Sequence, residues 1–218
     1  MKNISLTMIV LILFILSGIS IETNAQTANA DAIIGKTSQL YKEWGGMEIK
    51  FAANIRSEKN GVSESFEGTI IMKNNKFVLT TPDMKVWFDG TTQWTYFQGN
   101  NEVNIDTPSG SDLQSLNPMF LLQNYKKDFN VSYIGESTSA NAKIAQDIAL
   151  VPKRKDDIER IEVQIEKSTS LPVKLVVIMR NDMRSTINIK ENKKTSPSDN
   201  IFTFPEAEYS DAEIIDLR

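Results

Sequence analysis

The stretch from residue 70 to residue 105 constrains the fold more than any other part of the sequence. Short runs of β-branched and aromatic residues alternate there with Asn74-Asn75, Thr81-Pro82-Asp83, Asp89-Gly90 and Gln98-Gly99-Asn100. Asn and Gly tolerate positive φ and Pro presets φ, so such short segments reverse the chain between antiparallel neighbours. The pattern predicts a β-meander.

This meander also holds much of the aromatic surface, including two of the three tryptophans. Its aromatic residues are Phe77, Trp87, Phe88, Trp94, Tyr96 and Phe97. Methionines at 47, 72, 84, 119, 179 and 183 add flexible apolar side chains that adapt to varied shapes. Spacing alone fits an ordinary core as well as an apolar pocket, so both interpretations stay open at this point.

The flanking segments extend the β pattern. Apolar residues at near-helical spacing predict a helix over 31–44, which Gly45-Gly46 ends, and strict alternation over 47–55 and 62–73 predicts a hairpin that turns at 58–61. Gly68 lies inside the second strand of the hairpin, where glycine often marks a bend. Two short helical pieces are expected between 113 and 125, and five further strands between 129 and 190.

So many consecutive antiparallel strands, with helices in only two places, predict a sheet that curls. The expected fold class is mainly β with a few α-helices. We expect a curved antiparallel sheet that forms an incomplete β-barrel, with helices covering its open side. No internal repeat or second domain is apparent.

The first 25 residues have the pattern of a secretory signal peptide. Lys2 precedes an apolar run, and Thr23-Asn24-Ala25 supplies small residues for cleavage. A second cleavage site after Ala30 is an alternative, while a membrane anchor needs ~20 apolar residues and Ser17, Gly18 and Ser20 interrupt this run. We therefore expect a single domain over 26–218 that is exported and soluble in the periplasm.

The composition excludes several classes of function. The chain has no His and no Cys, so Ser-His and Cys-His nucleophilic sites, as well as the usual zinc ligand sets, are impossible. Its net charge of −4 does not favour a nucleic-acid partner. Asp83, Asp89 and Asp106 leave paired-carboxylate catalysis formally open, but each lies at a predicted turn or strand end, where Asp commonly serves the backbone. We expect no enzyme, no metal and no cofactor.

The order of four motifs resembles the periplasmic lipoprotein carrier family, the LolA proteins. These motifs are Lys73 to Phe77 with Thr80-Thr81-Pro82, Phe88-Asp89-Gly90 with Trp94-Thr95-Tyr96, Asn117 to Leu122, and Phe202 to Pro205. Asn117 to Leu122 is similar to the family's mouth helix, and we expect Pro118 to Leu122 to close over a ligand. The best-known members have Arg followed by Pro where this chain has Lys73-Asn74, and the Arg is thought to hold the mouth helix shut by hydrogen bonds. Because Lys offers no planar fork of donors, we expect such a latch to be weaker or differently made here.

The resemblance implies a chaperone that shields the acyl chains of lipoproteins in an apolar cavity and carries them from the inner to the outer membrane. Its expected partners are acylated lipoproteins, an inner-membrane lipoprotein-releasing transporter and, where one exists, an outer-membrane acceptor, with the carrier itself a monomer. The expected lining residues are Phe66, Met72, Met84, Phe88, Trp94, Tyr96, Met119, Phe120 and Leu121, with Lys73 as the latch. A binder of another lipid or apolar ligand and a lipoprotein-sensing domain remain alternatives on the same scaffold.

Overall fold

The computed structural model describes residues 19–109, 113 and 121–218, and the side chains of all of these except 19–26, 28 and 121–124. Twelve strands, two α-helices and two short 3₁₀ helices make up this part of the chain. Their bounds are α2 Ile19–Trp44, β1 Met47–Ser57, β2 Val62–Lys73, β3 Lys76–Thr80, β4 Met84–Phe88, β5 Gln93–Phe97, β6 Glu102–Asp106, α4 Leu121–Asp128, β7 Phe129–Thr138, β8 Ile144–Pro152, β9 Ile158–Glu166, β10 Pro172–Met179, β11 Arg184–Lys194, η2 Asp199–Phe202, η3 Glu206–Tyr209 and β12 Glu213–Asp216.

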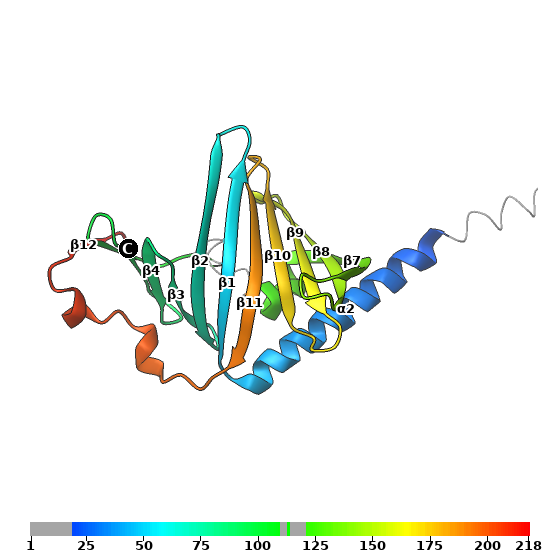
Figure 1. The fold of residues 1–218 in the computed structure, drawn as a ribbon, viewed down its shortest axis with the longest axis horizontal. Coiled ribbons are helices and arrows are strands. Elements are labelled where there is room, and N and C mark those ends of the chain that lie inside the picture. The colour runs from blue at the N-terminus through cyan, green and yellow to red at the C-terminus, as the bar shows by residue number, and fades with distance from the viewer. Residues whose placement is uncertain (1–18, 110–112, 114–120) are drawn as a thin grey trace, which may run out of the picture.

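All twelve strands belong to one open sheet in the order β12-β6-β5-β4-β3-β2-β1-β11-β10-β9-β8-β7. Every neighbouring pair is antiparallel except β12 and β6, which run parallel. Strands β1, β2, β10 and β11 stand in the middle, with β3, β4 and β12 on one side and β7 to β9 on the other (Figure 1). The prediction of a mainly β fold with a curved, unclosed antiparallel sheet is confirmed.

The sheet consists of two meanders, each continuous in sequence. Strands β1 to β6 form the first and β7 to β11 form the second, and the β1–β11 ladder joins them. The predicted hairpin is confirmed, with Met47 opposite Met72 and Ser57 opposite Val62. Asn74 at φ 57° makes the tight turn into β3, as its sequence context predicts.

The main core lies on the inner face of the sheet, under α2. Ala30, Ile33, Ile34 and Tyr41 of this helix are buried against inward side chains of the strands. The helix begins at Ile19, whereas the apolar spacing predicts a start near residue 31. Burial of Ala30 extends the packed face of the helix one turn before Ile33 and Ile34, and the sequence pattern does not show this because an alanine adds little apolar signal.

A second, smaller core lies on the outer face of β3 to β5. Val78, Trp87 and Phe202 are its buried members, and Phe204 and Tyr209 pack against them. The C-terminal segment, residues 195–218, crosses this face through η2 and η3 and then adds β12 beside β6 (Figure 1). The strands β3 to β5 are therefore covered on both faces.

In the described residues, no helix has the length and apolar character needed to cross a membrane. Of the two expected helical pieces, the second overlaps α4, although its expected start at Pro118 lies outside the described residues, as does most of the first piece.

Candidate functional site

An apolar cavity of about 240 Å³ lies on the inner face, over the middle of the sheet. It spans the junction of the two meanders, because β1 and β11 supply much of its lining. The lining residues are Ile49, Phe51, Ala53, Ile55, Phe66, Ile70, Leu79, Thr81, Met84, Ile158, Leu175, Val177, Met179, Ser185, Ile187 and Ile189. Alternate residues of each long strand face inward, which is why Ile49, Phe51, Ala53 and Ile55 all contribute.

The described lining has no charged side chain and only two hydroxyls, those of Thr81 and Ser185. The Thr81 hydroxyl is already engaged, because it lies 3.2 Å from both the amide nitrogen and the carbonyl oxygen of Met84. A cavity of this composition can bury an aliphatic chain. Its described lining contains no acidic or basic side chain that could transfer a proton, and none that could activate a hydroxyl as a nucleophile.

Phe51, held by its contact with Gly68, shapes one wall of the cavity. The two residues are directly opposite each other on β1 and β2, and the Phe51 ring lies over the glycine. A Cβ atom added to Gly68 would lie 2.5 Å from Phe51 Cζ, so only glycine lets the ring occupy this position. The ring of Phe66 meets that of Phe51 edge-on at a centroid distance of 6.4 Å.

The structure brings together four of the residues expected to line the cavity. Phe66 and Met84 line it directly. Met72 and Phe88 are buried in the main core on the same inner face, beyond the cavity wall.

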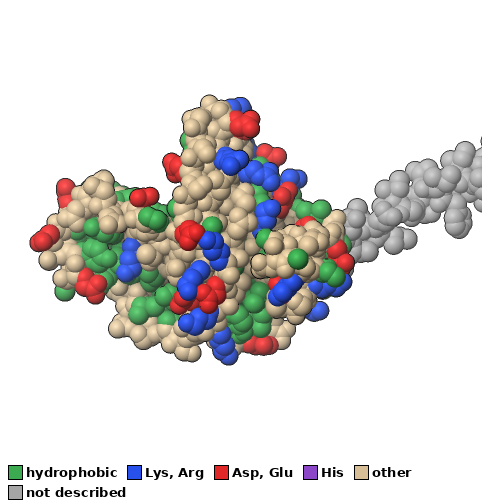
Figure 2. Space-filling view, in the orientation of Figure 1, with side chains coloured by type: hydrophobic (Ala, Val, Ile, Leu, Met, Phe, Trp, Pro, Cys, Tyr) green, Lys and Arg blue, Asp and Glu red, His purple; other side chains and the backbone are tan. Residues whose placement is uncertain are grey.

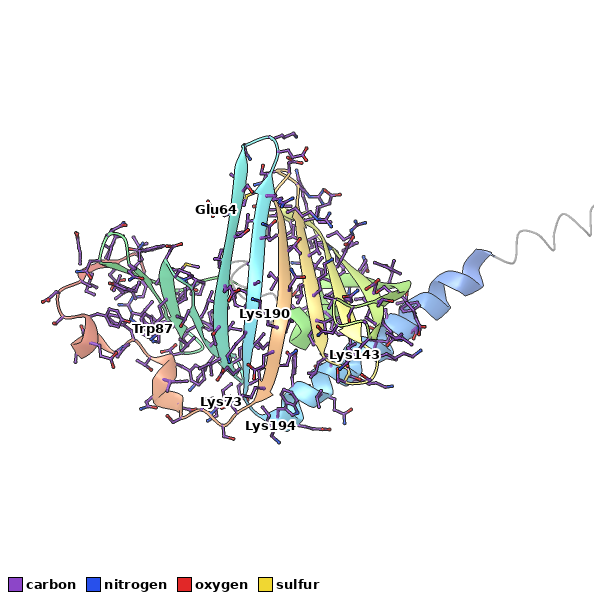
Figure 3. All side chains as sticks on the ribbon, viewed as in Figure 1. Glu64, Lys73, Trp87, Lys143, Lys190 and Lys194 are labelled. Atoms are coloured by element: carbon purple, nitrogen blue, oxygen red, sulfur yellow. The ribbon has the colours of Figure 1, made fainter. Side chains whose placement is uncertain are left out.

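Trp94 and Tyr96 lie on the opposite face of the sheet, so their expected place in the cavity is wrong. Both pack against the second core, and Tyr96 meets Tyr209 at a ring-centroid distance of 4.7 Å. Trp87 belongs to the same cluster (Figure 3). In β5 the inward residues are Gln93 and Thr95. The aromatic side chains of β5 pack instead on the face that the C-terminal segment covers.

Lys73 also differs from its expected role. It lies at the foot of β2, where Nζ is 2.7 Å from Asp199 Oδ1 and donates to the carbonyl of Pro197 at 3.1 Å (Figure 3). Lys76 reaches the other carboxylate oxygen of Asp199 at 3.2 Å. Hydrogen bonds from Lys73 and then from Lys76 lower the pKa of the Asp199 carboxyl. Lys73 therefore holds the C-terminal segment, and among the described residues it does not contact a mouth helix.

Three of the expected lining residues have side chains outside the described part of the structure. Met119 and Phe120 lie outside the described residues, as does most of the predicted lid from Pro118 to Leu122. Leu121 is the first residue of α4, but its side chain is outside the described part.

The inward residues of β10 and β11 were not among the expected lining residues. Leu175, Val177 and Met179 alternate along β10, and Ile187 and Ile189 along β11. The same alternation that identified β1 could have indicated them, but it does not tell which inward residues border empty space.

Two of the three candidate catalytic carboxylates, those of Asp89 and Asp106, have structural roles. Asp89 Oδ1 accepts hydrogen bonds from the amides of Thr91 and Thr92, both at 2.9 Å, and so stabilises its turn. Asp106 Oδ2 accepts a hydrogen bond from Gln93 at 3.3 Å. No group of acidic residues suited to hold a metal ion occurs among the described residues.

This geometry defines a class of protein, the incomplete β-barrels with an apolar cavity on the inner face of a curved sheet. The chain belongs to the LolA family, since the family model described as outer membrane lipoprotein carrier protein LolA matches residues 21–193. No protein of curated function matches the chain.

Solved structures share the fold at low sequence identity. An uncharacterized conserved protein from Thermus thermophilus matches with a TM-score of 0.54 and 13% identity, covering 86% of this chain and 99% of that one. A DUF1329 family protein from Desulfovibrio piger matches with a TM-score of 0.52 and 10% identity, covering 82% and 97%. A LolA superfamily protein from Nitrosomonas europaea gives a TM-score of 0.48 at 10% identity, covering 80% and 97%.

Proposed function

We propose that the protein shields acyl chains of lipoproteins in its cavity and carries them through the periplasm from the inner to the outer membrane. The observation that carries this proposal is the lining of the cavity, which is apolar apart from two hydroxyls. Each methylene transferred from water into such an environment gains ~0.8 kcal/mol, so covering an acyl chain offsets the cost of moving it through water. Membership of the lipoprotein carrier family supports the same function.

The size of the cavity indicates how the cargo is held. Its volume of about 240 Å³ is below the ~300–1,000 Å³ typical of pockets that enclose a drug-sized ligand. We infer that this form accommodates part of one acyl chain, and that a cargo with several chains requires the sheet to open further. Because the cavity spans the junction of the two meanders, a change in curvature at β1 and β11 alters its volume directly.

The remaining parts of the proposal concern partners and place. We infer that the protein is monomeric and periplasmic, that an inner-membrane lipoprotein-releasing transporter supplies the cargo, and that an outer-membrane acceptor receives it where one exists. The function is binding and hand-over, without a chemical step, and it needs no cofactor.

A direct test uses a fluorescent peptide whose N-terminal cysteine carries a diacylglyceryl group. We expect saturable binding to the purified protein and no binding of the unacylated peptide. Val177→Asn should weaken binding, because it places an amide in the cavity wall. Ile178→Asn is the matched control, since this neighbour on β10 faces outward with similar intermediate exposure.

The outcome separates the candidate functions. Equal loss of affinity in both variants, or binding of the unacylated peptide, contradicts the proposed site. Tighter binding of free phospholipid than of the acylated peptide favours a binder of another lipid. Acyl binding without transfer to acceptor membranes favours a lipoprotein-sensing domain.

A further inference from the structure

Arginines gather at one end of the outer face of the sheet. The sequence has six arginines among its 24 basic residues, and four of them lie at this end. Arg56 is on β1, Arg184 on β11, Arg160 on β9, and Arg180 follows the last residue of β10. In the space-filling view, Lys and Arg side chains lie below the tip of the protruding β1–β2 hairpin, with Asp and Glu side chains among them (Figure 2).

The strand register places three of these arginines in one row. Arg56 is directly opposite Arg184, and Ile178 of β10 is opposite both Arg184 and Arg160. Neighbouring strands are ~4.8 Å apart, so this arginine row (Arg56, Arg184 and Arg160) extends for ~15 Å across four strands. Their sequence neighbours Ile55 and Ser185 line the cavity, so the arginine row faces outward.

The arginine row carries more positive charge than its surroundings neutralise. Glu162 is the acid beside it on the same face, 2.6 Å from Arg160 and 3.9 Å from Arg184. Arg56 forms no ion pair within the described part of the chain. The side chains of Arg160 and Arg184 are 46% and 54% exposed.

The other acids at this end, Glu58, Asp156, Asp157 and Asp182, form no ion pair with the row in the part of the chain that the structure describes. The Asp182 carboxylate accepts a hydrogen bond from the backbone amide of Lys59, which joins the tips of the two hairpins, and Glu58 lies in the first of these tips. Asp156 and Asp157 lie beside Arg180, which donates to the carbonyl of Asp156 at 2.8 Å. Like charges directly opposite on neighbouring strands are destabilising, so the pair of Arg56 and Arg184 does not serve the stability of the sheet.

Two lysines in the middle of the same outer face form ion pairs with neighbouring acids. Lys50 pairs with Glu191 at 2.8 Å, and Lys190 pairs with Glu67. These two lysines therefore have acidic partners, whereas Arg56 has none among the described residues. Binding to an anionic membrane normally uses a broader group of ~4–8 basic residues, whereas a short row of guanidinium forks suits a few carboxylates at fixed spacing.

We propose that the arginine row is a docking site for an acidic segment of a partner protein, whose carboxylates receive bidentate hydrogen bonds from Arg56, Arg184 and Arg160. Rigid strands fix the spacing of the guanidinium groups, and the half-buried Ile178 between them adds an apolar contact. The same strands carry Ile55, Val177 and Ser185 on their inner face. A partner on the arginine row is thus seated beside one end of the cavity.

The probe for this docking site is a fluorescein-labelled peptide of alternating Glu and Ser, followed by fluorescence anisotropy at low salt. Arg56→Gln with Arg184→Gln should weaken its affinity about tenfold, because two charge-assisted contacts are lost. Arg56→Lys with Arg184→Lys keeps the charge but removes the forks, and should also weaken binding. Lys193→Gln with Lys194→Gln removes the same charge from the other end of β11, where Figure 3 places Lys194, and should change little.

Three results overturn the proposal: wild-type affinity in the Arg→Gln double variant, an equal loss in the lysine control, or tighter binding of the protein to phosphatidylglycerol vesicles than to the peptide. Both arginine variants should retain at least the wild-type midpoint of urea unfolding, since they relieve a like-charge pair or leave it unchanged. A loss of folding in them also contradicts the assignment.

Discussion

Replacing Gly68 with alanine should couple fold stability to ligand binding. The new Cβ would lie 2.5 Å from Phe51 Cζ and 3.0 Å from Phe51 Cε1. Ordinary carbon–carbon contacts are ~3.5–4.0 Å, so the ring has to move by ~1 Å or more, and the strand behind it leaves only the cavity as free space. Overpacking of this kind costs ~1–3 kcal/mol of unfolding free energy.

The displaced ring also takes volume from the ligand. If it excludes about two methylenes at ~0.8 kcal/mol each, affinity for an acyl chain falls by about tenfold to twentyfold. Urea unfolding measures the first effect, and titration with the fluorescent acylated peptide measures the second.

A double-mutant cycle with Phe51→Leu tests the cause. In that background the alanine meets no ring, so Gly68→Ala should cost much less unfolding free energy than it does in the wild type. Additive effects of the two substitutions on stability and affinity would refute the proposed clash. The remaining contact, 3.0 Å to the carbonyl oxygen of Thr80, would then be the cause instead.

Three further predictions follow from charge and burial. Asp199→Asn should loosen the C-terminal segment and change tryptophan emission at neutral pH. The pKa of the Asp199 carboxyl is lowered in the folded state, so the wild type should show the same change only when acid protonates this carboxylate. The absence of an acid-induced change in the wild type would contradict the role of the ion pairs. Burial raises the pKa of the Tyr41 and Tyr125 hydroxyls, so the unfolded state loses these protons first and the unfolding free energy should fall above pH ~10, as urea titrations across alkaline pH can check. Because Ala30 is fully buried under the sheet, mass spectrometry of the exported protein should find it retained, with cleavage after Ala25.

Sequence patterns predicted the strands well, because alternation and turn residues are local signals. The hairpin of β1 and β2, the meander through β6 and the strands β7 to β11 all follow from such signals. It was harder to predict which side chains of each strand face the main core. In β5 the pattern Gln93-Trp94-Thr95-Tyr96 suggests that the aromatic side faces the main core, but these aromatics face the C-terminal segment.

The reason is that β3 to β5 are buried on both faces, so hydrophobicity no longer distinguishes inner from outer. Coverage by residues 195–218 depends on contacts between segments far apart in sequence, such as Lys73 with Asp199. Local patterns do not contain that information. The cavity is a similar case, because Ile187 facing empty space and Ile161 facing a neighbour look alike in sequence.

The joining of two sequence-continuous meanders through the β1–β11 ladder has a consequence for the order of folding. Each meander needs only short loops to close, whereas pairing Phe51 with Ile189 brings together distant parts of the chain. The two halves should therefore form early and associate late. Since β1 and β11 supply much of the wall of the cavity, the cavity forms only at that last step, and a chain whose halves have not yet associated should not bind the acylated peptide.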